Sequence, residues 1–173
     1  IEKKRKFSSV DGLIWKDKGK IIQNKDRQLI HNLDSVSFPA WNLLPVGKYN
    51  DVFTQTPHFV TILATRGCPY RCTFCDRKNR MGYSWRMRSP ENVVQEMRMI
   101  HDKYGISEFM FFDDNFIVNR KWVLDFCREV EPFGFLWEVR ARVDMVDLPL
   151  LQALKKAGCY RIRYGMESAD NLT

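Results

Sequence analysis

The chain has 173 residues, a formal charge of +7, 45% hydrophobic and 28% charged residues. These values exclude a disordered, collagen-like or low-complexity chain and indicate a globular domain with a substantial core. No apolar run approaches the roughly 20 residues of a membrane-spanning helix, so no membrane association is expected. The odd count of five cysteines argues against a closed disulfide framework and favours a reducing compartment, the cytoplasm by default.

The first 58 residues show little regular patterning, and we interpret residues 1–58 as an irregular linker. Two short apolar segments, Val10 to Trp15 and Lys20 to Gln23, flank Asp17-Lys18-Gly19 and predict a small hairpin. The segment 37–45 is apolar and bounded by prolines. We expect it to dock its aromatic residues onto a neighbouring surface.

From residue 59 onward, strand and helix patterns alternate. The predicted strands are 59–65, 108–112, 135–143 and 160–164, and the predicted helices are 90–104, 121–130 and 149–157. Ser89 is the expected N-cap of the first helix, Pro90 its first residue and Gly105 its stop. The alternation predicts an α/β fold with a parallel sheet, of about four βα units. The polar residues that we single out in the following paragraphs come just after the C-terminal ends of these strands. In α/β barrels and open sheets, active sites lie at that edge.

Positive charge is concentrated in two stretches. Residues 1–30 hold nine Lys and Arg against four Asp and Glu, and residues 66–90 hold seven against one. A basic chain can bind nucleic acid, so a nucleic-acid-binding or RNA-modifying module stabilised by a cysteine-bound metal or cluster is the alternative hypothesis. The first run, residues 3–6, has a simpler interpretation as a solvated terminus, and nucleic acid is not the expected partner.

The second basic stretch surrounds three cysteines, Cys68, Cys72 and Cys75, spaced Cys-x3-Cys-x2-Cys. Structural zinc sites normally need four ligands from two short pairs, and no second pair exists here. The spacing also differs from that of bacterial ferredoxins. Three thiolates on one loop can hold three irons of a four-iron cubane, which leaves the fourth iron open for a substrate or cofactor.

This loop, with Phe74 just before the last cysteine, resembles the signature of the radical S-adenosylmethionine (SAM) superfamily. The resemblance implies a [4Fe–4S] cluster bound by the three cysteines and SAM bound at the open iron. It further implies an electron donor of flavodoxin or ferredoxin type and cleavage of SAM to a 5′-deoxyadenosyl radical. Residues 59–173 would form the N-terminal part of the superfamily's partial, TIM-like (β/α) barrel, with Phe74 near the adenine.

The same resemblance assigns further cofactor contacts. Residues 111–116 are similar to the second-strand motif, where many members carry Gly-Gly-Glu, so either Asp113 or Asp114 would receive the α-amino group of SAM. Arg142 would meet its carboxylate or ribose, and Glu167 its ribose. Asp113 could instead cap the following segment, and Glu167 could be a carboxylate at a helix start.

Other residues have open interpretations. Arg142 could pair with Glu138 or Asp144 on the barrel surface. The loop cations, Arg71, Arg77, Lys78 and Arg80, could tune the cluster potential, attract an anionic substrate or be solvated. Cys127 and Cys159 are expected to be buried thiols.

The pattern of residues 10–41 resembles the connector that follows the cobalamin-binding domain in cobalamin-dependent radical enzymes, a group that includes methyltransferases and cyclases. Cobalamin would then be held by a domain that lies upstream. Because a closed (β/α) barrel takes about 250 residues, we expect this chain to be a fragment of a longer enzyme that methylates, cyclises or rearranges an unknown substrate.

Overall fold

The computed structural model describes residues 6–76 and 82–168 and divides the chain into two units, Ile1–His31 and Asn32–Thr173. The first unit contains an antiparallel hairpin of β1 (Ile14–Asp17) and β2 (Lys20–Gln23). Lys18 and Gly19 have φ angles of 43° and 85°, as a type I′ turn requires, so the predicted hairpin is confirmed.

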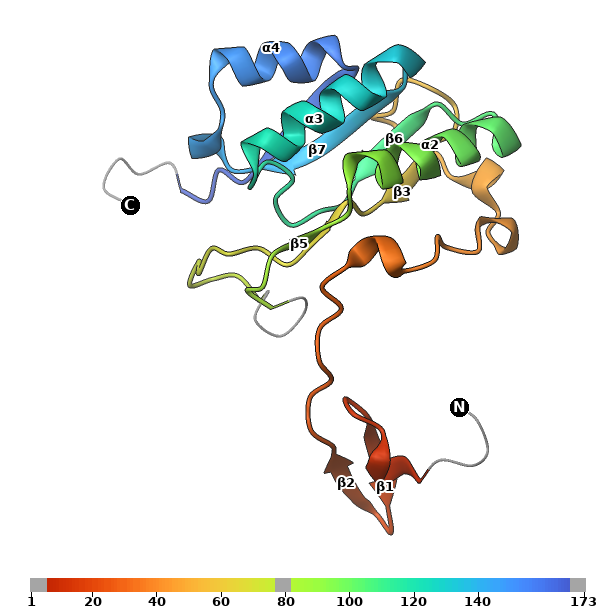
Figure 1. Ribbon diagram of the computed structural model, residues 1–173, viewed down its shortest axis with the longest axis vertical. Coiled ribbons are helices and arrows are strands. Elements are labelled where there is room, and N and C mark those ends of the chain that lie inside the picture. The colour runs from red at the N-terminus through yellow and green to blue at the C-terminus, as the bar shows by residue number, and fades with distance from the viewer. Residues whose placement is uncertain (1–5, 77–81, 169–173) are drawn as a thin grey trace. The chain divides into compact units, whose positions relative to one another are not determined.

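The second unit is built on a four-stranded parallel sheet of order β3-β6-β7-β8, with three helices along one face (Figure 1). Its strands are β3 (Val60–Ile62), β6 (Glu108–Phe111), β7 (Leu136–Ala141) and β8 (Cys159–Tyr164). Its helices are α2 (Pro90–Tyr104), α3 (Arg120–Val130) and α4 (Leu148–Lys156). The predicted alternation of strand and helix is confirmed.

Short elements complete the described part of the chain. A two-stranded antiparallel ladder joins β4 (Thr65–Arg66) to β5 (Arg86–Met87). Single 3₁₀ turns are η1 (Phe7–Ser9), η2 (Leu33–Ser35), η3 (Trp41–Leu43), η4 (Val46–Lys48), η5 (Glu131–Phe133) and η6 (Val143–Met145). Across residues 6–76 and 82–168, no helix has both the length and the apolar content to cross a bilayer.

Local sequence signals explain where the helices begin and end. The Ser89 hydroxyl accepts a hydrogen bond from the backbone N–H of Asn92, Pro90 is the first residue of α2, and Gly105 ends the helix with a φ of 69°. Asn119 and Asp147 cap α3 and α4 in the same way. Each cap satisfies a backbone donor that has no partner within the helix.

One predicted strand is interrupted. The segment 59–65 was expected to be continuous, but β3 ends at Ile62 and β4 begins at Thr65. The Asp113 carboxylate explains the break, because it accepts hydrogen bonds from the backbone N–H groups of Ala64 and Thr65 and so draws the chain away from the sheet. From residue 90 onward, the predicted boundaries differ from the structure by at most two residues, whereas the first hairpin strand, expected over Val10 to Trp15, is Ile14–Asp17.

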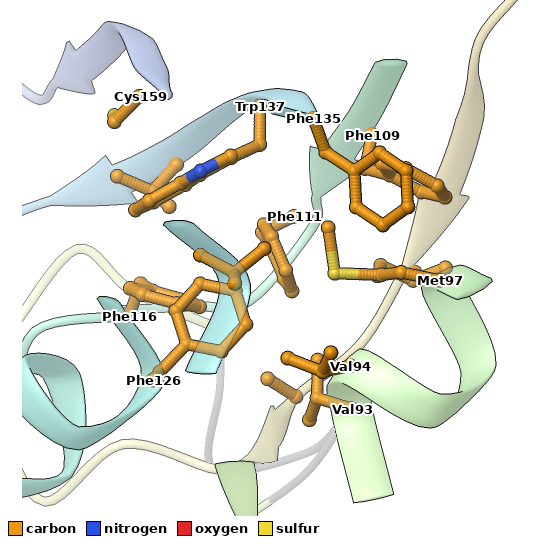
Figure 2. Packing of buried hydrophobic residues seen from close by; sticks show 14 of the residues in the cluster. Val93, Val94, Met97, Phe109, Phe111, Phe116, Phe126, Phe135, Trp137 and Cys159 are labelled. Carbon is orange, nitrogen blue, oxygen red and sulfur yellow. The ribbon is translucent and has the colours of Figure 1, made fainter. Parts of the chain in front are cut away.

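The core lies between the sheet and the helices, and aromatic rings fill it (Figure 2). Phe111 of β6 meets Phe126 of α3 edge to face, with ring centroids 5.4 Å apart, and Phe126 meets Trp137 of β7 at 5.2 Å. Full burial of such a side chain contributes about 1.5–3 kcal/mol. Cys127 and Cys159 are buried as predicted, and burial raises the pKa of each thiol to about 12.

Part of the predicted linker packs within the second unit. The Trp41 indole donates a hydrogen bond to Glu96 of α2 over 2.9 Å, and the Arg88 guanidinium pairs with the same buried carboxylate. The Phe38 ring lies under Arg88 at 5.3 Å. The expected docking of this segment is therefore confirmed, and the compact units divide between His31 and Asn32.

Candidate functional site

A cavity of about 540 Å³ lies where the cysteine loop meets the C-terminal ends of the strands. Its walls come from the loop after β4, from the segment that follows β6, and from the last residues of β7 and β8 with the segments that follow them. The lining residues are Cys68, Tyr70, Cys72, Phe74, Cys75, Asp114, Asn115, Arg140, Ala141, Arg142, Val143, Asp144, Arg163, Tyr164, Gly165 and Glu167. All of the site residues predicted from the sequence line this cavity, except Asp113.

The cysteine loop begins at Gly67, where only glycine fits. The φ of Gly67 is 81°, and a Cβ at this position would lie 2.4 Å from the backbone oxygen of Ser84. The turn that follows carries Cys68 buried, Cys72 half-buried and Cys75 exposed. The three thiols therefore enter the cavity from different depths.

The donor set fits a multinuclear cluster better than a single metal ion. Within the described residues, no three His, Cys, Asp or Glu side chains are grouped closely enough to hold one ion. Cys68, Cys72 and Cys75 nevertheless line one cavity. Thiolates that each bind a different iron of a cubane need not converge on a single point, and soft sulfur ligands suit iron–sulfur clusters.

The two adjacent aspartates occupy different environments. Asp113 is fully buried and accepts hydrogen bonds from the Thr65 N–H (2.5 Å), the Thr65 hydroxyl (2.5 Å) and the Ala64 N–H (3.3 Å). Burial raises the pKa of Asp113 to about 6, against the opposite effect of these hydrogen bonds. Asp114 lies on the cavity wall. Asp113 therefore anchors the chain that leads into the cysteine loop, and Asp114 faces the site.

Arg142 is held in place from three sides. Its guanidinium pairs with Asp144 through contacts of 3.0 and 2.6 Å, and it lies 4.3 Å above the Tyr70 ring. Its Nη1 is 3.6 Å from the Cys72 sulfur. The hydrogen bonds of the pair raise the pKa of Arg142 and lower that of Asp144. Of the two partners considered from the sequence, the structure shows Asp144, whereas Glu138 pairs with other arginines.

The remaining predicted contacts lie at the cavity rim. The Phe74 ring is 67% exposed, so it is available to cover a planar ligand. Glu167 has a φ of 52°, and its carboxylate lies where a Cβ on Gly165 would collide with it. A helix that began at Glu167 would extend past Ser168, where the described part of the chain ends, so the helix-start alternative for Glu167 stays a prediction.

Two arginines of the cavity wall were not predicted from the sequence, and three of the predicted loop cations fall outside the described residues. Arg140 and Arg163 line the cavity, and the available signal was the alternation of charged residues along their strands. Of the loop cations, Arg71 lies 5.1 Å over the Tyr83 ring. The other three, Arg77, Lys78 and Arg80, fall outside the described residues, and their expected roles stay predictions.

A parallel βα sheet with a three-cysteine loop at its C-terminal edge defines the class of radical enzymes that use an iron–sulfur cluster and SAM. The sequence model of the Radical SAM superfamily matches residues 62–173, and the chain belongs to this superfamily. The resemblance proposed from the cysteine spacing is thus confirmed.

Individual relatives agree with this assignment. The uncharacterized methyltransferase PH0819 of Pyrococcus horikoshii is 33% identical over 98% of the chain and 37% of its own length. The anaerobic magnesium-protoporphyrin IX monomethyl ester cyclase of Cereibacter sphaeroides is 30% identical over 94% of the chain and 27% of its length. The chain therefore spans about a third of the length of these relatives.

A solved structure matches the fold. The cobalamin-dependent SAM radical enzyme OxsB, a structure with aqua-cobalamin and SAM bound, aligns with 97% of this chain and 26% of its own, with a TM-score of 0.69 and 22% identity. This likeness confirms the predicted partial α/β barrel.

Proposed function

We propose that the chain is part of a radical SAM enzyme of the cobalamin-associated branch, which cleaves SAM reductively in order to methylate or cyclise its substrate. The observation that carries the proposal is the shared cavity, in which three cysteines of the superfamily motif meet Asp114, Arg142 and Glu167. A [4Fe–4S] cluster bound at the cysteines would supply the electron that breaks the sulfonium bond. Methyltransferases and cyclases among the relatives support the two outcomes.

The chain's own residues would bind and orient the cofactor. Asp114 would accept hydrogen bonds from the α-amino group of SAM, because a carboxylate suits a cationic donor. Phe74 would pack on the adenine, and Glu167 would accept from the ribose hydroxyls. Arg142 would donate to the Cys72 thiolate, which stabilises negative charge on the cluster side of the cavity.

The proposal also includes a domain that binds cobalamin and a protein that donates electrons. The structures of OxsB and of the methyltransferase TsrM from Kitasatospora setae, each solved with cobalamin bound, support a cobalamin-binding domain elsewhere in the full-length protein. The reducing cytoplasm would keep the cysteines as thiols, and a reductant of flavodoxin or ferredoxin type would deliver the electron to the cluster. Cobalamin retained by the purified full-length protein, measured by its visible absorption, tests this part.

The cluster is tested by anaerobic reconstitution of the full-length protein with iron and sulfide. We expect a cubane absorption band, and 5′-deoxyadenosine after addition of dithionite and SAM. A Cys72→Ala variant should lose both signals, whereas the buried Cys127→Ala control should keep them. Retention of the cubane band in Cys72→Ala would contradict the proposal.

A further inference from the structure

A methionine sulfur links three segments that meet at the cavity. The Met145 thioether accepts a hydrogen bond from the Tyr70 hydroxyl of the cysteine loop and another from the Asn115 amide after β6, each over 3.2 Å. Met145 itself belongs to η6, the turn that follows β7, and its side chain packs against the hydrophobic core. A thioether is a weak acceptor, so each bond is modest, but the two together tie the cysteine loop and the segment after β6 to this turn.

The same turn carries Arg142. The backbone N–H of Met145 donates a hydrogen bond to the Arg142 carbonyl over 3.3 Å, which closes the turn. The face of the Tyr70 ring lies against the Arg142 side chain, with the guanidinium carbon 4.3 Å from the ring centroid. Nη1 of this guanidinium is 3.6 Å from the Cys72 sulfur. Because the hydroxyl of Tyr70 is held by Met145, the ring restricts the guanidinium to a position next to the Cys72 sulfur.

The ion pair with Asp144 does not by itself hold Arg142 in this position. The two side chains are 36% and 56% exposed, and an ion pair with this much contact with solvent stabilises a geometry only weakly. Asp144 also lies two residues from Arg142 in the same turn, so it would move together with Arg142. Tyr70 belongs to the cysteine loop, and its contact therefore fixes Arg142 relative to the loop.

We propose that Tyr70 and Met145 are positioning residues that hold Arg142 against the Cys72 ligand of the cluster and so set the cluster's reduction potential. This depends on the proposed function, because Cys72 must be an iron ligand. A cation that donates to a ligand sulfur favours the more negative, reduced state, and hydrogen bonds to the sulfurs are among the determinants of cluster potential. Loss of the Tyr70 contact should therefore make the cluster harder to reduce.

The test is an EPR-monitored redox titration of the reconstituted full-length protein. Tyr70→Leu removes the ring and the hydroxyl, and it should lower the reduction potential by at least about half of the shift that Arg142→Gln causes. Tyr70→Phe and Met145→Leu remove only the hydrogen bond between the two side chains and should give smaller shifts in the same direction. Tyr104→Phe on α2 is the matched control and should give no shift, because its hydroxyl makes no hydrogen bond to any described residue and Tyr104 does not line the cavity.

A double variant distinguishes positioning from a separate effect of the ring. If Tyr70 acts through Arg142, Tyr70→Leu combined with Arg142→Gln should have the potential of Arg142→Gln alone, whereas independent effects would add. Additive shifts, or an unshifted potential in Tyr70→Leu or in Tyr70→Phe, would overturn the inference. Where Tyr70→Leu does not retain a cluster, the milder Tyr70→Phe decides.

Absorbance of the same samples separates the two proposals. A missing cubane band in the unaltered protein would refute the proposed function, and the positioning roles with it. A normal cubane band with an unshifted potential in the Tyr70 variants would refute the positioning roles alone.

Discussion

Asp113 provides the sharpest test of how the cysteine loop is held. Its carboxylate is fully buried and accepts three hydrogen bonds from Ala64 and Thr65, which lie four and three residues before Cys68. Substitution by alanine leaves two backbone N–H groups and a hydroxyl with no acceptor from this side chain. Substitution by asparagine keeps the shape but turns an NH₂ donor toward one of these donors.

The hydrogen bonds set the expected loss of stability. A buried polar group left without its partner costs about 1–3 kcal/mol, so Asp113→Ala should lower the free energy of unfolding by about 3–6 kcal/mol. Asp113→Asn should lower it by about 1–3 kcal/mol, since one acceptor oxygen remains. Both variants should also bind iron less well, because the start of the cysteine loop is no longer fixed.

The titration of Asp113 gives a second signature. Its pKa is raised from 3.8 to about 6 in the folded state, so between these values the folded protein binds more protons than the unfolded chain. The contribution of Asp113 to stability is therefore full below about pH 4 and falls as the pH rises to about 6, by roughly 3 kcal/mol. The Asn variant lacks a titratable group and should lose this component.

Urea unfolding followed by fluorescence of the buried Trp137 and Trp122, from pH 4 to pH 7, measures both effects. The difference in unfolding free energy between the unaltered protein and Asp113→Asn isolates the Asp113 titration from that of other groups. If that difference is independent of pH, or if Asp113→Ala is as stable as the unaltered protein, the reasoning is wrong.

Two further predictions concern the loop. Gly67→Ala should destabilise the protein by about 1–3 kcal/mol, because a Cβ at positive φ would also collide with the Ser84 oxygen, and an unchanged urea midpoint would contradict this. Arg142→Gln should lower the cluster's reduction potential by on the order of tens of millivolts, since a cationic donor to the Cys72 sulfur is lost. An EPR-monitored redox titration measures the shift, and Asp144→Asn, which keeps the cation, should move the potential less.

The location of the site could be predicted because it follows from topology. In a parallel sheet all strands end at the same edge, so residues just past four strands meet even though they are distant in sequence. Cys68, the pair Asp113 and Asp114, Arg142 and Glu167 were placed at this edge in this way, while their roles came from the family resemblance. All of them except Asp113 line one cavity. Strand and helix periodicity was sufficient for this part.

Other features depend on information that periodicity lacks. Asp113 and Asp114 are chemically identical neighbours, and only the bend of the chain at Ala64 decides which one is buried. The opposition of Arg140 and Arg163 depends on the register of two strands, which includes a shift near Trp137. The register of two paired strands cannot be predicted from the sequence of either strand alone.

The unequal exposure of the three cysteines also sets an order of chemical vulnerability. Solvent-accessible thiolates are oxidised first, so a molecule of oxygen or peroxide meets Cys75 before Cys72, and Cys68 last. In the chain without a bound cluster, oxidation by air would therefore begin at Cys75. The two deeper cysteines would stay reduced, so early oxidative injury could be repaired by reducing one side chain.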